Sequence, residues 1–464
     1  MLIRPVDEHK ITELRSSFRG RILLPGDSDY DKARTIWNAM IDKHPALIAQ
    51  CADARDVMTA IAFTRENDLP GSVRGGGHSI AGNALCDNGV VIDLSLMRQV
   101  RVDPESQTAT AQGGVLWGEF DRATQQHGLA TTGGLISTTG IGGFTLGGGM
   151  GWLERKYGLT CDNLIAAEVV TADSKLVRAS ADENRDLFWA IRGGGGNFGV
   201  VTEFTYRLHP VGPMVLGGML IWPFSEADQL YQLYREYTAD LTDDLTLMAS
   251  PLTAPRAPFV PPEMQGKPCV AIIGCFAGSV EDGNRVLAPL RDASPVADMF
   301  TEMPYVAVQS MLDPIAPAGI RNYWKSDYLA EITDDFIQVL AEYFRGVPSP
   351  MTHVDVHHLE GAYGRVGEDE TAFSHRDARY IVNIVSAWTD LADDQRNINW
   401  TRDLWNAIRP HSLGATYLNF VTNEGEDRVK ASFGELKYHR LAQIKRKYDP
   451  TNFFRRNHNI KPAE

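Results

Sequence analysis

Apolar and polar residues alternate along the first part of the chain in a pattern that predicts short strands and single helices. Short apolar runs or strict alternation predict strands in residues 45–50, 70–77, 89–95, 99–103, 108–114 and 200–211. Apolar residues at helical spacing predict helices in 53–68, 115–128 and 186–193, the second ending at Gly128. Residues 163–180 have the form of a hairpin with Asp173 and Ser174 at its turn.

The pattern changes between Pro210 and Pro213. Beyond this point glycine is sparse, and strand-like runs alternate with helical ones. The predicted strands are 214–224, 268–278 and 380–388, and the predicted helices are 226–241, 333–345, 396–410 and 438–448. This order predicts an α+β fold in which residues 213–414 form a sheet flanked by helices.

Composition and charge exclude several classes of protein. The chain of 464 residues has a formal net charge of −14 and no clustered basic surface, which argues against a nucleic-acid partner. Its five cysteines are scattered and form no CxxC pair, so neither a disulfide framework nor a zinc site is indicated. The charged N-terminal stretch lacks the apolar core of a secretory signal, and no apolar run is long enough to span a membrane. A soluble, cytoplasmic protein is expected.

Many of the 42 glycines fall in three clusters, at 74–79, 131–152 and 191–199. A single cluster usually marks a tight turn, and neither a P-loop nor a Rossmann dinucleotide fingerprint fits these sequences. Together the clusters can supply backbone N–H groups to a pyrophosphate and let a flat ring approach the main chain, with Arg74 as a counter-charge. Binding of a pyrophosphate by backbone amides does not require the imidazole of His78. This residue is therefore either a functional group or a loop histidine that caps a turn.

Four segments carry a resemblance to a known family: 73–95, 133–164, 187–204 and 448–462. In order and spacing they resemble the FAD-linked oxidases of the berberine bridge enzyme group, which have the vanillyl-alcohol oxidase and p-cresol methylhydroxylase (PCMH-type) flavoprotein fold. The resemblance covers almost the whole chain and is specific for cofactor and fold, much less so for substrate. It implies an FAD-binding domain in two pieces, 1–212 and a returning segment 415–464, around a substrate domain at 213–414 built on an antiparallel sheet.

The resemblance also implies how FAD is held. His78 is expected to bond covalently to the 8α carbon of the flavin, and Ile136 stands where many relatives carry a second linking cysteine, so a single link is expected. Thr139 occupies the position that controls oxygen access to the flavin, and its small side chain favours an oxidase. His458 replaces a glutamine of the relatives and is expected to face away from the cofactor. The other implied cofactor-binding residues are Arg74, Gly75, Gly76, Gly77, Ser79, Gly133, Thr138, Gly142, Gly143, Gly148, Gly149, Asn163, Gly199, Val200, Asn457 and Asn459.

Two segments are candidates for acid–base chemistry. Tyr417 and Asn419 share one face if their segment is a strand, and the same pair lies next to the flavin in the relatives; the alternative is a pair packed between domains. Residues 353–360, read as a strand, place His358 and Glu360 on one face and His353, Asp355 and His357 on the other. The resemblance favours His358 and Glu360 as acid–base residues. The three histidines and two carboxylates of residues 353–360 also raise the alternative of a metal site, but their spacing does not match a standard zinc site, and no metal is predicted.

These observations predict an FAD-dependent oxidase that takes a hydride from a CH–OH or CH–NH carbon of a small molecule and forms hydrogen peroxide from O2. A flavin dehydrogenase with another acceptor, and a flavin-free binding protein of the same fold, are the alternatives. The substrate is not fixed by the fold. Arg321, Trp324 and Lys325 are expected either to line its entrance or to stabilise the sheet. A monomer or homodimer without membrane or nucleic-acid partners is expected.

Overall fold

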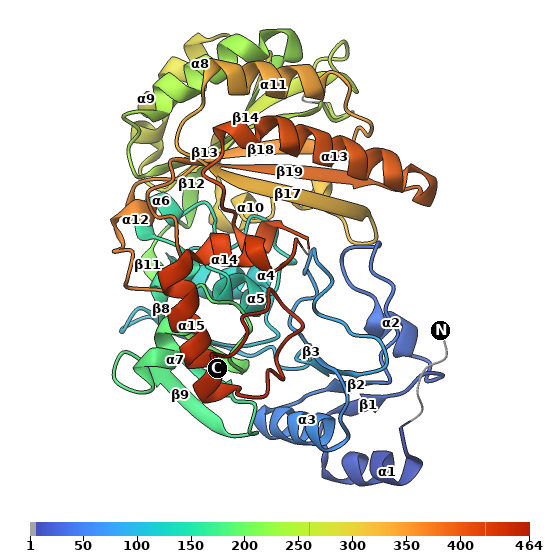
Figure 1. Ribbon diagram of the computed structural model, residues 1–464. Coiled ribbons are helices and arrows are strands. Elements are labelled where there is room, and N and C mark those ends of the chain that lie inside the picture. The colour runs from blue at the N-terminus through green and yellow to red at the C-terminus, as the bar shows by residue number, and fades with distance from the viewer. Residues whose placement is uncertain (1–5, 259, 423) are drawn as a thin grey trace.

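The computed structural model describes residues 6–258, 260–422 and 424–464, and all elements named below lie within these ranges. In the view of Figure 1, a lower part holds the N-terminal sheets and the C-terminal helices, and an upper part holds one large sheet under a layer of helices. This arrangement confirms the predicted α+β class.

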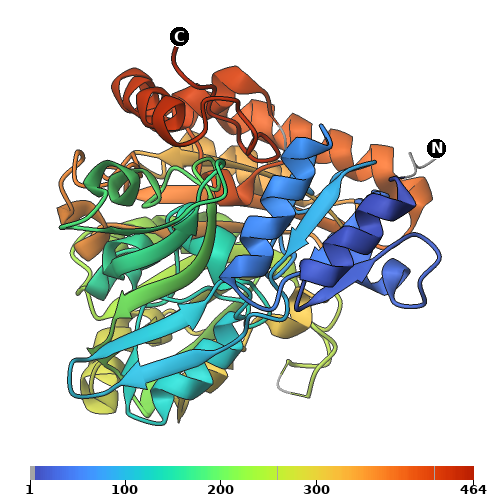
Figure 2. The same cartoon turned by 90° about the horizontal axis from the view of Figure 1, so that it is seen from below.

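The N-terminal sheet has the strand order β1-β2-β4-β3, with β2 and β3 both parallel to β4. Its elements are β1 (Arg21–Leu23), β2 (Leu47–Gln50), β3 (Gly71–Arg74), β4 (Val90–Asp93), α1 (Glu8–Ser17), α2 (Tyr30–Arg34) and α3 (Ala54–Glu66). The helix α3 begins close to the predicted position because the Asp53 carboxylate caps it, accepting from the N–H groups of Arg55 and Asp56. Figure 2 shows α1 and α3 side by side at this end of the molecule.

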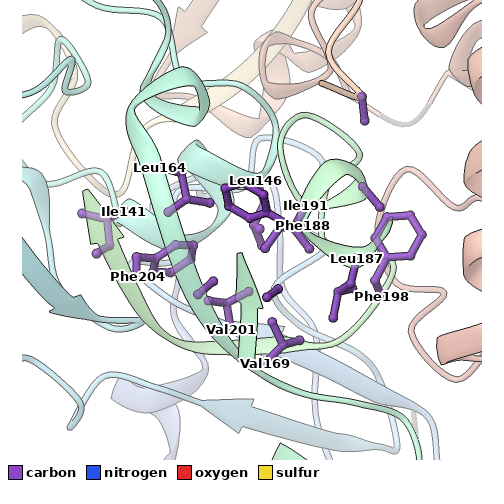
Figure 3. Packing of buried hydrophobic residues seen from close by; sticks show 14 of the residues in the cluster. Ile141, Leu146, Leu164, Val169, Leu187, Phe188, Ile191, Phe198, Val201 and Phe204 are labelled. Atoms are coloured by element: carbon purple, nitrogen blue, oxygen red, sulfur yellow. The ribbon is translucent and has the colours of Figure 1, made fainter. Parts of the chain in front are cut away.

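A second, antiparallel sheet has the order β5-β6-β10-β8-β9. The elements of this region are β5 (Val100–Asp103), β6 (Thr108–Gln112), β7 (Leu129–Ala130), β8 (Leu164–Val170), β9 (Leu176–Ser180), β10 (Val200–Arg207), β11 (His209–Pro210), α4 (Trp117–Gln125), α5 (Ile141–Leu146), α6 (Glu154–Tyr157) and α7 (Arg185–Ala190). Figure 3 shows Val201 and Phe204 of β10 in one buried cluster with Ile141 and Leu146 of α5. This packing presses the glycine-rich α5 against the sheet.

The large antiparallel sheet has the order β15-β12-β14-β13-β18-β19-β17, with β16 also paired to β12. Its strands are β12 (Met214–Pro223), β13 (Leu245–Thr253), β14 (Pro268–Phe276), β15 (Ala297–Asp298), β16 (Thr301–Pro304), β17 (Arg321–Leu329), β18 (His353–His358) and β19 (Tyr380–Trp388). Its helices are α8 (Ala227–Thr238), α9 (Val280–Asp292), α10 (Tyr305–Val308), α11 (Asp334–Phe344), α12 (Ala362–Arg365) and α13 (Asp394–Ile408).

The two faces of the large sheet have different environments. On β18 and β19, Val354, Val356, Val382 and Ile384 pack with apolar residues of the covering helices, which lie above the sheet in Figure 1. Because side chains alternate along a strand, the residues between them face the lower part of the molecule. The large sheet therefore offers one face to a helix layer and the other to the N-terminal sheets.

After the large sheet the chain returns to the lower part with α14 (Glu426–Phe433) and α15 (Glu435–Tyr448). Leu441 and Ile444 of α15 share a buried cluster with Leu187 of α7. The fully buried Lys445 amine donates to the carbonyl oxygen of Asn197 at 2.7 Å and to the Asp449 carboxylate at 2.7 Å. A buried ammonium group is stable only when it is paired and hydrogen-bonded, and this one fixes α15 to the third glycine cluster.

Candidate cofactor and substrate site

A cavity of about 370 Å³ lies between the lower part and the face of the large sheet that is turned toward it. On one side it is lined by the three glycine clusters and by residues 456–458. On the other side it is lined by Asn322, Trp324, His353, Asp355, His357, Asn383, Val385 and Ala387 of β17, β18 and β19. The cavity thus joins segments that are distant in the sequence.

The first two glycine clusters cross in direct backbone contact. A Cβ atom on Gly76 would stand 2.4 Å from the backbone nitrogen of Gly140, and a Cβ on Gly140 would stand 2.3 Å from the nitrogen of Gly76. Only glycine at both positions allows this approach. The crossing places bare main chain on the cavity wall and holds the turn at 74–79 beside the start of α5.

His78 projects from this turn at the cavity wall. Its Nε2 lies 2.9 Å from the Thr138 hydroxyl, and its Nδ1 lies 3.5 Å from the Thr139 hydroxyl. Trp37 stacks on the ring, with 5.0 Å between the centroids and 22° between the planes. Burial lowers the pKa of His78 to about 4, so the imidazole is neutral near pH 7 and keeps a lone pair on one nitrogen.

Arg74 does not line the cavity, contrary to its expected role as a counter-charge. Its guanidinium points away and donates to the carbonyl oxygen of Ala33. Among the residues that the structure describes, the cation that lines the cavity is Arg456, an exposed residue that sequence reasoning missed although it lies within the last of the four motifs. His458 was expected to face away, but it lines the cavity, and burial lowers its pKa.

The predicted cofactor residues divide between the cavity wall and its support. Those on the wall are Gly75, Gly76, Gly77, His78, Ser79, Thr139, Gly142, Gly143, Gly199, Val200 and Asn457. Arg74, Gly133, Thr138, Gly148, Gly149, Asn163 and Asn459 are not on it. Ile136, at the position of the absent cysteine, also lines the cavity.

The residues behind the wall have structural contacts. The Gly149 N–H donates to the Tyr417 hydroxyl at 2.9 Å. The Asn163 amide donates to the carbonyl oxygens of Tyr157 and Leu159 at 2.9 and 3.0 Å, so it holds a loop together. Gly133 packs so closely that a Cβ there would stand 2.8 Å from the side chain of Gln309.

Tyr417 and Asn419 come together at the cavity, although their segment is not a strand. Residues Leu418–Phe420 form a 3-10 turn, and the Asn419 amide donates to the Tyr417 hydroxyl at 2.8 Å. With the Gly149 N–H, the phenol oxygen accepts from two donors, which leaves its own proton free to be donated. Burial raises the pKa of Tyr417 well above its usual range, so this side chain is suited to donate a hydrogen bond, not to act as a base.

The structure places His358 and Glu360 away from the cavity. His358 is fully buried, with its Nε2 2.6 Å from a Glu360 carboxylate oxygen and 3.3 Å from the Arg155 guanidinium. The reason is register: β18 packs Val354, Val356 and His358 toward the helix layer. The choice of face made from the sequence was therefore wrong, and these two residues are not at the candidate site.

The opposite face of β18 supplies the polar groups of the cavity. Asp355 accepts from the Ser250 hydroxyl at 2.8 Å, and its other oxygen lies 3.5 Å from Nε2 of His353. His357 is 5% exposed; burial lowers its pKa, and the Asp355 charge opposes that shift. Asn383 is the register partner of Asp355 on β19, and its buried Oδ1 has no hydrogen-bond partner in the described residues. These groups are available to a ligand.

The rest of this part of the cavity is largely apolar and aromatic, with Trp37, Met248, Leu312, Trp324 and Phe420 on its walls. Of the three residues considered for the entrance, only Trp324 lines it. Arg321 pairs with Asp394 at 2.5 Å and Lys325 with Glu424 at 2.7 Å. Within the described ranges, no group of three or more His, Cys, Asp or Glu side chains is placed to hold a metal ion, and no described helix has the length and apolar character of a membrane span.

Two protein families match segments of this chain that line the cavity. Residues 45–180 match the FAD binding domain family, and residues 416–461 match the family described as berberine and berberine like. The fold and the cavity together define an FAD-binding enzyme of the PCMH type, as predicted.

Relatives match over nearly the full length. An FAD-linked oxidoreductase of Dictyostelium discoideum is 31% identical over 98% of this chain and 97% of that protein. The (R)-6-hydroxynicotine oxidase of Paenarthrobacter nicotinovorans is 31% identical over 96% of this chain and 97% of that protein. The crystal structure of 6-hydroxy-D-nicotine oxidase from Arthrobacter nicotinovorans has a TM-score of 0.87 at 30% identity and covers 96% of this chain and 99% of that one. The chain belongs to the berberine bridge enzyme-like family of FAD-linked oxidoreductases.

The residues present fit FAD. The crossing at Gly76 and Gly140 leaves a wall of main chain that any Cβ there would disrupt. The buried Oδ1 atom of Asn457, a residue of the wall, and that of Asn459 beside it have no hydrogen-bond partner in the described part of the chain, as expected for acceptors that serve a ligand. Arg456 adds a positive charge suited to a dianionic cofactor.

Proposed function

We propose that this enzyme is an oxidase that takes a hydride from a CH–OH or CH–NH carbon of a small molecule, with FAD attached through His78 alone and O2 as the electron acceptor. The observation that carries the proposal is His78: a neutral imidazole on the cavity wall, at the end of a glycine turn, fixed by Thr138 and Trp37. Bound FAD would supply the hydride acceptor.

The polar groups of β18 are suited to the proton of the substrate hydroxyl or amine. Because burial lowers the pKa of His357, its imidazole is neutral near pH 7 and able to accept a proton. The Asp355 carboxylate on the same face stabilises the cation that results. From the other side of the cavity the Tyr417 hydroxyl donates a hydrogen bond, held in place by Asn419 and the Gly149 N–H. The aromatic walls exclude water and favour an aromatic or polycyclic substrate.

Two residues of the second glycine cluster support single attachment and an oxidase. Ile136 lines the cavity and cannot form a thioether. Thr139 also lines the cavity, and its small side chain leaves room for dioxygen. In this proposal, residues 1–212 and 415–464 form the FAD-binding domain and residues 213–414 form the substrate domain; the packing of α15 against α7 supports that division.

The test begins with the colour and chemistry of the purified protein. We expect flavin to precipitate with the protein in acid and to fluoresce on a denaturing gel, and we expect His78→Ala to abolish both signals while the fold is kept. Covalent flavin in that variant would contradict the assignment of His78. Peroxide release, screened over alcohols, amines and sugars, identifies the substrate. Reoxidation of the dithionite-reduced protein in air within seconds indicates an oxidase, and reoxidation over minutes indicates the alternative, a dehydrogenase.

A further inference from the structure

The His78 ring is held from two directions by residues outside its own turn. The Thr138 hydroxyl lies 2.9 Å from Nε2, whereas the Thr139 hydroxyl lies 3.5 Å from Nδ1, at the limit of a hydrogen bond. Trp37 stacks on the ring face. Stacking fixes the plane of the imidazole, and the Thr138 contact fixes its rotation within that plane.

Trp37 is itself fixed to both parts of the molecule. Its backbone N–H donates to the Gly77 carbonyl at 3.0 Å, and its indole N–H donates to the Ala316 carbonyl at 2.9 Å. Its carbonyl oxygen accepts from the Gly319 N–H at 3.0 Å. The stacking surface is thus a rigid part of the wall.

We propose that Thr138 is a positioning residue for the covalent attachment of FAD: its hydroxyl holds Nε2 of His78 and leaves the lone pair on Nδ1 to form the bond. This inference rests on the proposed function, which assigns attachment to His78 and gives Thr138 no part in the bond-forming step. A neutral imidazole has one N–H and one lone pair, and a threonine hydroxyl both accepts and donates. Before attachment the hydroxyl accepts from the Nε2–H, and afterwards it donates to the Nε2 lone pair.

The balance of the attachment reaction shows why Nε2 needs a partner. A bond forms between Nδ1 and the 8α carbon, and one C–H bond of that methyl group breaks. The methyl group loses one proton, the imidazole loses the proton on Nε2, and two electrons remain with the flavin. Dioxygen takes both electrons and both protons as hydrogen peroxide. Nε2 is therefore the atom from which a proton leaves, and Thr138 is the hydroxyl in contact with it.

The experiment compares Thr138→Val, which removes the hydroxyl but keeps the shape, with Thr138→Ser, which keeps the hydroxyl. Thr138 is exposed, so neither change is expected to disturb the fold. Thr131→Val is the matched control, because the buried Thr131 hydroxyl has no hydrogen-bond partner in the described residues. Each protein is produced with ample riboflavin and incubated with FAD in air, and the acid-precipitable flavin is measured over time against total bound flavin.

We expect Thr138→Val to attach flavin about tenfold more slowly, the effect of losing one hydrogen bond, with total bound flavin unchanged. Thr138→Ser and Thr131→Val should attach it at the rate of the unmodified protein. Equal rates for Thr138→Val and the unmodified protein overturn the inference, as does equal impairment by valine and serine. As an independent pair, Trp37→Phe, which keeps an aromatic face but loses the indole N–H, should lower the rate less than Trp37→Leu, which removes the stacking; equal rates in the two variants would argue against the stacking part of the inference. If His78→Ala retains covalent flavin, the proposed function fails instead, so the two failures are distinguishable.

Discussion

At the scale of single residues, the cavity face of β18 shows burial and charge acting against each other. His357 lies on one strand face with Asp355 and His353. Removal from water lowers its pKa, the Asp355 carboxylate raises it, and the second imidazole lowers it again, with burial the largest of these. The net result is an imidazole that stays neutral near pH 7 beside a carboxylate that can stabilise its protonated form.

The assignment of His357 as the base predicts a large loss of turnover in His357→Gln. With a substrate found by the peroxide screen, we expect kcat to fall about 100-fold or more, while covalent flavin stays at the level of the unmodified protein.

The substitution Asp355→Asn removes the charge that raises the pKa of His357. The acidic limb of the pH profile of kcat/KM should therefore move to lower pH.

The neighbouring residue offers the matched control. His358→Gln makes the same substitution one position along β18, on the face away from the cavity. It should reduce thermal stability and leave the activity per folded molecule nearly unchanged. Equal loss of kcat in both variants would argue against His357 as the base.

The sequence predicts whether a residue lies at the cavity where a motif constrains the backbone. It does not do so where a side chain can point in more than one direction. His78 follows three glycines, one of which crosses Gly140 closely, so its place on the wall was predictable. Arg74, beside those glycines, has a long side chain that turns away from the cavity to the Ala33 carbonyl. The faces of β18 were both polar enough to line a cavity, and only the packing of Val354 and Val356 under the helices decides between them.

At the scale of elements, the crossing of the 74–79 turn and the start of α5 builds the glycine-rich wall of the cavity. Gly76 and Gly140 face each other's backbone, whereas a Cβ added to Gly143, inside α5, would have no atom within 4 Å beyond its own helix. Both Gly76 and Gly143 line the cavity. One glycine is needed for the fold, and the other leaves open space.

These two glycines predict opposite effects of the same added methyl group. Gly76→Ala should lower the free energy of unfolding by about 1–3 kcal/mol, because backbone must move to admit the Cβ. Gly143→Ala should keep or raise it, by about 0.5–1 kcal/mol, because alanine is the better helix former. Urea unfolding measures both. Since the new methyl enters the cavity, Gly143→Ala should also bind less total flavin; equal stabilities for the two variants would contradict the crossing.

Elements with strong local signals were predictable, and those set by tertiary contacts were not. The helix α3 has its capping aspartate in the sequence, and the turn at Gly128 has the positive φ of 64° that glycine permits. Strand β13 lies in the middle of the large sheet but was not recognised, because it contains Pro251 and no regular alternation. The segment around Tyr417 resembles a strand in composition, yet it forms a 3-10 turn that is closed by the Phe420 N–H donating to the Tyr417 carbonyl oxygen at 2.9 Å. The Tyr417 hydroxyl oxygen also accepts from the Gly149 N–H, a contact that is distant in the sequence.

At the scale of the whole molecule, buried polar contacts join the two parts between which the cavity lies. Arg155 of α6 donates to the carbonyl oxygens of Leu245 at 3.0 Å and Leu241 at 2.9 Å in the upper part. Asp121 of α4 accepts from the amide of Gln309, beside α10, at 3.1 Å. Burying polar groups costs free energy, but once they are hydrogen-bonded they fix the orientation of the two parts relative to each other.

The buried contact between Asp121 and Gln309 predicts how the stability of the folded protein depends on pH. Burial raises the pKa of Asp121 to about 7, above its value in the unfolded chain, so the folded protein holds a proton that the unfolded chain releases above about pH 4. The stability that the protonated Asp121 contributes is therefore present at low pH and declines as the pH rises to about 7.

The substitution Asp121→Asn should remove this decline of stability with pH. Relative to the unmodified protein, the variant should gain roughly 3 kcal/mol between pH 5 and pH 8, at about 1.4 kcal/mol for each pH unit up to 7. Urea unfolding at both pH values measures the gain, and the exposed Asp240→Asn is the control, for which no such difference is expected. If the difference in the free energy of unfolding between Asp121→Asn and the unmodified protein does not change with pH, Asp121 is ionised in the folded protein and the contact with Gln309 contains a charge.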